Sequence, residues 1–67
     1  MKDDWYFTFG AGQEHDYHYV VIKDRTYAEA RDRMVKEYGI AWSGQYDVDT
    51  FRDRGLFARM TKLKEIE

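Results

Sequence analysis

One segment constrains the fold more than any other, because it carries a helix signal with a start, a buried side and an end. It covers residues 26–39 and has the sequence TYAEARDRMVKEYG. Thr26 can cap the first turn, and Glu29 can bond back to the Thr26 backbone in a capping box. Gly39 supplies the left-handed residue that ends many helices. The sequence therefore predicts a main helix here.

This predicted helix has one apolar side. Apolar residues recur at the spacing that lines one face of a helix: Tyr27, Ala30, Met34, Val35 and Tyr38. The other side places acids four residues before bases, Glu29 before Arg33 and Asp32 before Lys36. We expect the rest of the chain to pack on the apolar side.

Strand patterns flank the helix. Residues 5–9 and 17–23 are rich in aromatic and β-branched residues, and the short polar loop between them predicts an antiparallel hairpin. In the second strand the side chains alternate, with His18, Val20 and Ile22 on one face and Tyr17, Tyr19 and Val21 on the other. Residues 40–46 predict a third strand, with Ile40, Trp42 and Tyr46 on one face.

The last third of the chain is less regular. Gly44 marks a bulge or a close approach in the third strand. Asp47 and Asp49 are both candidates to cap a short second helix that runs through Arg54 and ends at Gly55. Residues 57–67 fit a helix or an edge strand, and we favour the strand. The order is β-β-α-β-(α)-β, an α+β fold with a small antiparallel sheet and one main helix packed on one face.

Size limits the stability of this fold. The 67 residues suffice for one small domain, residues 1–67, which buries only about 60% of its unfolded surface. With no cysteine, disulfides and thiolate-bound zinc cannot add stability. Aromatic residues, 18% of the chain, and self-association are the remaining sources. We therefore expect a homo-oligomer, which open sheet edges would also favour.

Charge and hydropathy exclude two classes of partner. The net charge is −2 and acids and bases are interspersed, so no basic stripe predicts direct nucleic-acid binding. No apolar run approaches the length of a membrane span, and we expect no signal peptide. We expect a soluble cytoplasmic protein without a membrane partner.

Four motifs resemble those of a family of short proteins common in bacteriophages and prophages. They are FTFGAGQ at residues 7–13, YVVI at 19–22, TYAEARDRM at 26–34 and YGIAWSGQY at 38–46. Family members typically carry FTFG-x-G-Q, A-R-x-x-M and W-x-x-Q-Y. The chain departs at Ser43 and Gly44, where the family usually has an aromatic residue. The resemblance implies a viral accessory protein acting in the host cytoplasm, and small proteins of that origin often antagonise host defences.

Candidate ligand contacts begin in the first loop. A glycine-tolerant hairpin turn is the favoured interpretation of residues 10–13, because the glycine-lysine pattern of a phosphate-binding loop is missing. A ligand-contacting loop that includes Gly12 is the alternative, because the adjacent Gln13 is polar and can read a base edge. The dense group of Glu14, His15, Asp16 and His18 is interpreted as solvated loop residues, since its spacing suits metal coordination poorly.

Arginine and aromatic residues supply the other candidates. Arg31 borders the apolar side of the helix, where its stem can cover the core or its guanidinium can bind phosphate or carboxylate. The aromatic residues exceed what so small a core can hide, so some should line a pocket or an interface. The predicted ligand-binding residues are Gly12, Gln13, Tyr19, Arg31, Trp42, Gln45 and Tyr46.

These features predict a non-enzymatic binding protein that antagonises a bacterial anti-phage defence system, with no catalytic residue, metal or cofactor. In the main prediction, protomers assemble and sequester a nucleotide-like signal, which stacks on Tyr or Trp and meets Arg31 with its phosphates. In the alternative, an exposed aromatic face binds a host defence protein, such as a CRISPR nuclease effector. A small metal-dependent enzyme is a distant third possibility.

Overall fold

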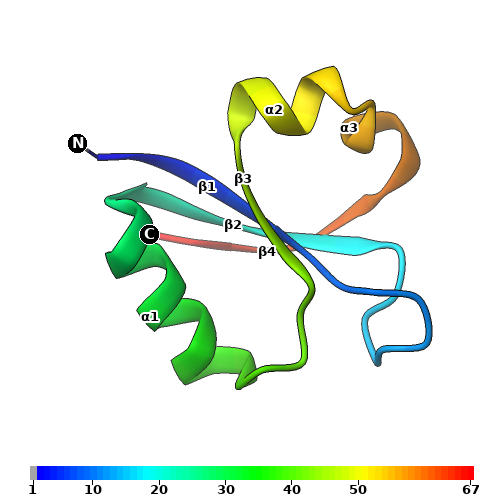
Figure 1. Ribbon diagram of the computed structural model, residues 1–67, viewed down its shortest axis with the longest axis horizontal. Helices are drawn as coiled ribbons and strands as arrows, with labels where there is room; N and C mark the ends of the chain where they lie inside the picture. Colours follow the sequence, from blue (N-terminus) through cyan, green and yellow to red (C-terminus); the bar gives the residue numbers. More distant parts are fainter. Residues whose placement is uncertain (1) are drawn as a thin grey trace.

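A four-stranded mixed sheet runs between two helical layers in the computed structural model, which describes residues 2–67 (Figure 1). The elements follow in the order β1 (Asp3–Thr8), β2 (His18–Arg25), α1 (Tyr27–Tyr38), β3 (Gly44–Asp47), α2 (Val48–Asp53), α3 (Leu56–Arg59) and β4 (Thr61–Ile66). Across the sheet the strand order is β3-β1-β2-β4. The α+β class predicted from the sequence is confirmed.

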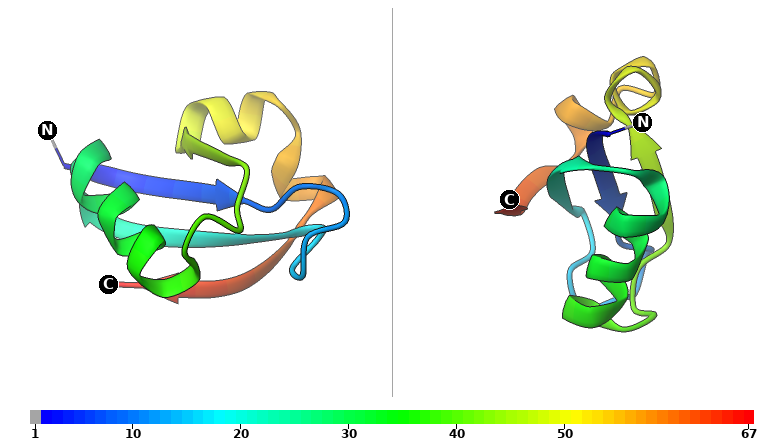
Figure 2. Two further views of the ribbon diagram at one scale, coloured as in Figure 1. Left: turned by 60° about the horizontal axis from the view of Figure 1, so that its bottom comes forward. Right: turned by 90° about the vertical axis from the view of Figure 1, so that its left-hand side faces the viewer.

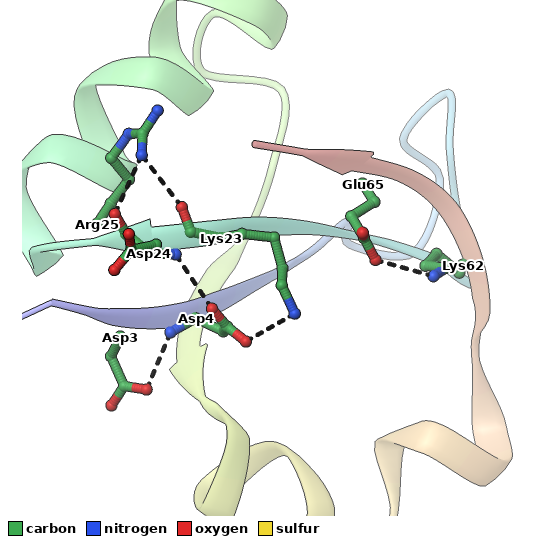
Figure 3. A network of polar contacts seen from close by, with 7 residues as sticks. All are labelled: Asp3, Asp4, Lys23, Asp24, Arg25, Lys62 and Glu65. Atoms are coloured by element: carbon green, nitrogen blue, oxygen red, sulfur yellow. Dashed lines mark hydrogen bonds and ion pairs between the residues drawn. The ribbon is translucent and has the colours of Figure 1, made fainter.

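The β1–β2 hairpin is antiparallel, as predicted. Phe7 lies opposite Val20 and Trp5 opposite Ile22, so these residues share one face of the sheet. Near the open end of the hairpin the register shifts beside Asp4. There the Asp4 carboxylate lies 2.8 Å from Lys23 Nζ and accepts a hydrogen bond from the Asp24 backbone N–H (Figure 3). The irregular end of the hairpin is therefore held by polar contacts.

The last strand corrects the prediction of a purely antiparallel sheet. Residues 57–67 do contain the favoured strand, but β4 runs parallel to β2. The reason is topological: parallel neighbours need a long crossover, and α1, β3, α2 and α3 together supply one. The other two pairings, β1 with β2 and β1 with β3, are antiparallel.

The start and stop signals of α1 are confirmed. The Thr26 hydroxyl accepts a hydrogen bond from the Glu29 N–H, and the Glu29 carboxylate accepts one from the Thr26 N–H, at 3.2 and 3.0 Å. The Gly39 N–H donates to the Val35 carbonyl at 2.8 Å. Gly39 has a positive φ of +65° but a ψ of −128°, so it turns the chain away without adopting the left-handed helical conformation.

The predicted apolar side of α1 is only partly correct. Ala30 and Met34 are fully buried, whereas Tyr27 is 54% exposed and Val35 is 38% exposed. The predicted acid–base pairs do not form among residues 2–67, and Arg33 pairs with Glu37 at 3.2 Å instead. One cause is the cap, which engages the Glu29 carboxylate that was expected to bind Arg33.

The main core lies between α1 and the sheet. Its buried members come from β1, β2, α1, β4 and the loop after β1, and they are Phe7, Phe9, Val20, Ile22, Ala30, Met34 and Ile66. Trp5, Tyr38 and Trp42 pack against this cluster from its border. Large apolar residues from distant parts of the chain therefore meet on the face predicted from the alternation in β2.

The helices α2 and α3 lie on the other side of the sheet from α1 (Figure 2). A second, aromatic core lies beneath them, and the sequence did not predict it. Phe51 of α2 is fully buried. It stacks on Tyr6 with ring centroids 4.8 Å apart and meets Tyr19 and Phe57 edge-on at 4.9 and 4.7 Å. As predicted, Asp47 caps α2 by accepting a hydrogen bond from the Thr50 N–H at 2.8 Å.

The chain before α2 corrects one strand prediction and confirms another. β3 begins only at Gly44, so Ile40, Trp42 and Tyr46 do not share a strand face. Ile40 is 91% exposed, while Trp42 packs edge-on against Phe7, with centroids 5.1 Å apart. The close approach predicted at Gly44 is confirmed, because a Cβ there would lie 2.7 Å from the Tyr46 hydroxyl.

Candidate binding site

Three of the predicted ligand-binding residues lie along the side of α1 that faces β3. Gln45 Nε2 donates a hydrogen bond to the Tyr27 carbonyl at 3.0 Å, which fixes β3 beside the first turn of α1. Arg31 and Val35 follow Tyr27 in steps of four, so they continue along this side of the helix. Trp42 lies where the chain returns from α1, and its Nε1 donates to the Gly39 carbonyl. We call this surface the α1–β3 seam: Tyr27, Arg31, Val35, Trp42 and Gln45.

The seam presents an aromatic ring and a cation to solvent. The Tyr27 ring packs edge-on against Trp5 with centroids 5.2 Å apart, yet more than half of the residue remains exposed. Arg31 is exposed, and its side chain forms no hydrogen bond or ion pair with any of residues 2–67. An exposed guanidinium can engage a carboxylate or a phosphate through two parallel hydrogen bonds. The seam therefore combines apolar contact area with an anion-binding group.

Gln45 contributes a polar group of another kind. Its Nε2 is bonded to the Tyr27 carbonyl, but its Oε1 is buried and has no hydrogen-bond donor within residues 2–67. Exchanging the two amide atoms would set Oε1 against the Tyr27 carbonyl, an acceptor against an acceptor, so the contact itself determines the orientation. A buried acceptor without a donor typically costs about 1–3 kcal/mol. The seam thus holds the one buried side-chain polar atom in the described residues that lacks a partner.

Gly12 and Gln13 lie outside the seam, in the β1–β2 loop. The Gln13 side-chain oxygen accepts a hydrogen bond from the Gly10 N–H, and the Gln13 N–H donates to the Gly10 carbonyl. Gly12 is exposed and has a φ of +85°, which favours glycine. These contacts support the hairpin-turn interpretation, because the Gln13 side-chain oxygen is engaged in closing its own turn.

Tyr19 and Tyr46 lie on the opposite face of the sheet from the seam. Tyr19 is only 9% exposed and belongs to the aromatic core. The Arg54 guanidinium lies over the Tyr46 ring, 5.4 Å from the ring centroid, and forms a cation–π contact within the chain. Because neighbouring strand residues point to opposite faces, Gln45 and Tyr46 cannot contribute to one surface, although they are adjacent in sequence.

The histidines serve packing and local hydrogen bonds. The His15 ring lies edge-on to Phe9 and Tyr38, with centroids 5.2 and 5.7 Å away. His18 Nδ1 lies 2.9 Å from the Asp16 carbonyl oxygen. Within residues 2–67, no three metal-type ligands converge on one point. The group at residues 14–18 is thus dispersed in the fold.

Displaced pKa values occur outside the seam and have structural causes. Hydrogen bonds from the Thr26 and Thr50 backbone lower the pKa of Glu29 and Asp47, and Lys23 lowers the pKa of Asp4. Burial raises the pKa of Tyr6 and Tyr38. These pKa shifts are therefore caused by two helix caps, one surface ion pair and aromatic packing.

Sequence reasoning missed Tyr27 as a surface residue, because its spacing placed it on the apolar side of the helix. The one signal that separated it from Ala30 and Met34 is its hydroxyl, which favours a position where one end of the side chain reaches water. Of the predicted residues, Gln45 lies beside the first turn of α1 because β3 returns there, and Trp42 lies beside the end of the helix. Arg31 lies between these two points in the sequence of α1.

Comparison of the chain with protein-family models, curated proteins and solved structures finds no match. The resemblance to phage proteins thus stays a prediction from motifs. Among residues 2–67, no helix combines the length and the apolar character needed to cross a membrane.

Proposed function

We propose that the chain is a phage-encoded, non-catalytic protein that binds a host defence protein through the α1–β3 seam and so antagonises anti-phage defence in the host cytoplasm. The observation that carries the proposal is the pairing of the half-exposed Tyr27 with the unpartnered Arg31 on one side of α1. Tyrosine and arginine are enriched among the residues that dominate interface energetics. The defence role itself follows from the motif resemblance.

Further apolar residues lie toward the C-terminal end of α1 and just after it. Val35 continues the same side of α1, and Ile40 stands almost fully exposed just beyond the end of the helix. Trp42 lies partly buried in the segment that follows. Apolar contacts of this kind around an arginine fit a protein surface that offers a carboxylate. A CRISPR nuclease effector is one class of target.

Sequestration of a nucleotide-like signal is the second candidate function, and the chemistry of the seam favours it too. Tyr27 offers a ring for a base, and Arg31 offers a guanidinium for a phosphate. Residues 2–67 form no enclosed pocket, and small-molecule sites are normally concave. In this function a second protomer completes the site across the seam, which agrees with the homo-oligomer expected from the sequence.

One affinity purification distinguishes the two proposed functions. Tagged protein is recovered from bacteria that carry defined defence systems and is examined by native and then denaturing mass spectrometry. Docking predicts one host protein at a fixed stoichiometry, retained by Arg33→Ala and lost with Tyr27→Ala. Sequestration predicts protomers that carry an excess mass released as a nucleotide. Recovery of bare protomers from every strain would contradict both.

A further inference from the structure

The outer edge of β4 is a second surface with binding capacity. β4 pairs with β2 on one side only, so its other side presents unpaired backbone N–H and C=O groups over six residues. Most side chains of β4 are also exposed to solvent: residues 61–65 are all exposed, and only Ile66 is buried. The opposite edge strand, β3, has only four residues. β4 is therefore the longer and more open edge of the sheet.

Apolar side chains stand beside this edge. Leu63, at the irregular point of the β2–β4 pairing, is 37% exposed, and Phe57 in the preceding helix is 42% exposed. Tyr17 is 68% exposed and adopts a φ of +65°, which is unusual for a bulky residue. The Thr61 N–H donates to its carbonyl at 3.0 Å, which ties Tyr17 to the start of β4. A strand that pairs with this edge could therefore contact apolar side chains in addition to forming backbone hydrogen bonds.

Charge argues against a second copy as the occupant. In a two-fold antiparallel pairing, opposite residues point to the same face, so each register is centred on a residue. A register centred on Lys64 sets Lys64 against its own copy, and one centred on Glu65 does the same for Glu65. A register centred on Ile66 sets Glu65 against Glu67. A parallel in-register pairing also opposes identical charges.

The same charges suit a different strand. Lys64 forms no ion pair among residues 2–67, while Glu65 lies 3.2 Å from Lys62 on the exposed strand (Figure 3). We propose that the β4 edge binds an extended segment of another protein in antiparallel orientation, with an acidic residue opposite Lys64 and a basic residue opposite Glu65. Backbone hydrogen bonds supply the attachment, and the two charge pairs set the register. This proposal does not depend on the seam or on a defence role.

Two synthetic peptides of equal composition test the proposal. Val-Lys-Glu-Val-Glu-Thr, paired antiparallel, matches the charges of residues 64 and 65, whereas Val-Glu-Lys-Val-Glu-Thr opposes them. Each is titrated to millimolar concentration into 15N-labelled protein. We expect the matched peptide to shift the β4 backbone amide resonances and to bind about tenfold more tightly than its control. The double variant Lys64→Glu, Glu65→Lys should invert the preference, and Arg33→Ala, at a residue paired with Glu37 on α1, should leave it unchanged.

Three results would overturn the proposal. The first is that neither peptide shifts the amides of residues 61–66. The second is equal binding of both peptides, which would remove the role of charge. The third is a concentration-dependent shift of the same amides without peptide, which would make a second copy the occupant. Circular dichroism on the double variant confirms that its fold is retained.

Discussion

The two faces of the sheet differ in whether their side chains find partners within the chain. Under α2 and α3, Phe51 is enclosed by Tyr6, Tyr19 and Phe57, and the rings contact one another in stacked and edge-on pairs. Under α1 the apolar core is buried as well, but its border at the seam retains an unpartnered buried amide oxygen and an arginine side chain without a partner among residues 2–67. In this chain the many aromatic residues are largely used in a core. The polar groups without partners at the border of the α1 core therefore mark a binding surface better than the number of aromatic residues does.

The largest expected effect tests whether the α2–α3 face stabilises the domain. Phe51→Ala should lower the free energy of unfolding by about 3–5 kcal/mol, because it leaves a cavity at the centre of the aromatic core. That is a large part of the roughly 5–15 kcal/mol that holds a native domain together. Urea denaturation measures the loss. Phe57→Ala, at a residue 42% exposed, is the matched control and should cost less than about 2 kcal/mol. Equal losses would contradict the central role of Phe51.

A smaller loss is expected at the start of α1, on the other face. Thr26→Ala removes the hydroxyl that accepts from the Glu29 N–H and should cost about 1 kcal/mol. Thr26→Ser retains this acceptor and should stay close to wild type. Chemical denaturation of both variants measures the difference, and identical stabilities for serine and alanine would show that the cap does not stabilise the domain.

The two caps also predict a dependence of stability on pH. The pKa values of Glu29 and Asp47 are lower in the folded state than in the unfolded state. Between the folded and unfolded pKa values the unfolded state binds more protons, so this stabilisation is complete above about pH 5 and is lost as the pH falls. The melting temperature should therefore fall on acidification. Asp47→Asn preserves a capping oxygen without titrating and should flatten the fall; an unchanged slope would count against this contribution of Asp47.

The smallest effects on stability are expected at the seam. Arg31→Ala removes an exposed side chain without a partner and should change the free energy of unfolding by less than about 0.5 kcal/mol. Gln45→Met removes one hydrogen bond together with one unpaired buried oxygen, so the two changes should nearly offset each other. Thermal melts of both variants provide the measurement. A loss above about 1 kcal/mol for Arg31→Ala would identify Arg31 as a structural residue that covers the core with its stem.

Self-association is expected from the sequence and is independent of these variants. Light scattering should give a mass above that of one protomer at tens of micromolar protein. The charges of β4 disfavour pairing through that edge, so the seam and the β3 edge are the surfaces where we expect contact. A monomer mass at this concentration would contradict the expectation and would weaken sequestration more than docking.

Local signals in the sequence predicted the local structure well. The cap at Thr26, the turn at Gly39, the hairpin alternation and the cap at Asp47 depend on neighbours within a few residues. The parallel placement of β4 and the aromatic core beneath α2 depend instead on where distant segments meet. Periodicity could not predict this arrangement, because one short apolar run suits either face of a sheet.

The candidate site was predictable in its residues but not in its grouping. Arg31, Trp42 and Gln45 were identified from residue type. The return of the chain after α1 places Trp42 beside the end of that helix and Gln45 beside its first turn. Tyr19 was identified on the same grounds and lies in a core. Residue type alone cannot separate these outcomes, since a tyrosine suits a buried cluster and an interface equally well.

The central claim is that the α1–β3 seam is the binding surface of a defence antagonist. The most direct test is phage plating on bacterial strains that each carry one defence system and express the wild type, Arg31→Ala or Arg33→Ala. Arg33 occupies another side of the same helix and pairs with Glu37, so it is the matched control. We expect the wild type and Arg33→Ala to restore plating on one strain, and Arg31→Ala to fail there at equal protein level. Equal restoration by both variants would contradict the seam, and no restoration by the wild type on any strain would contradict the defence role.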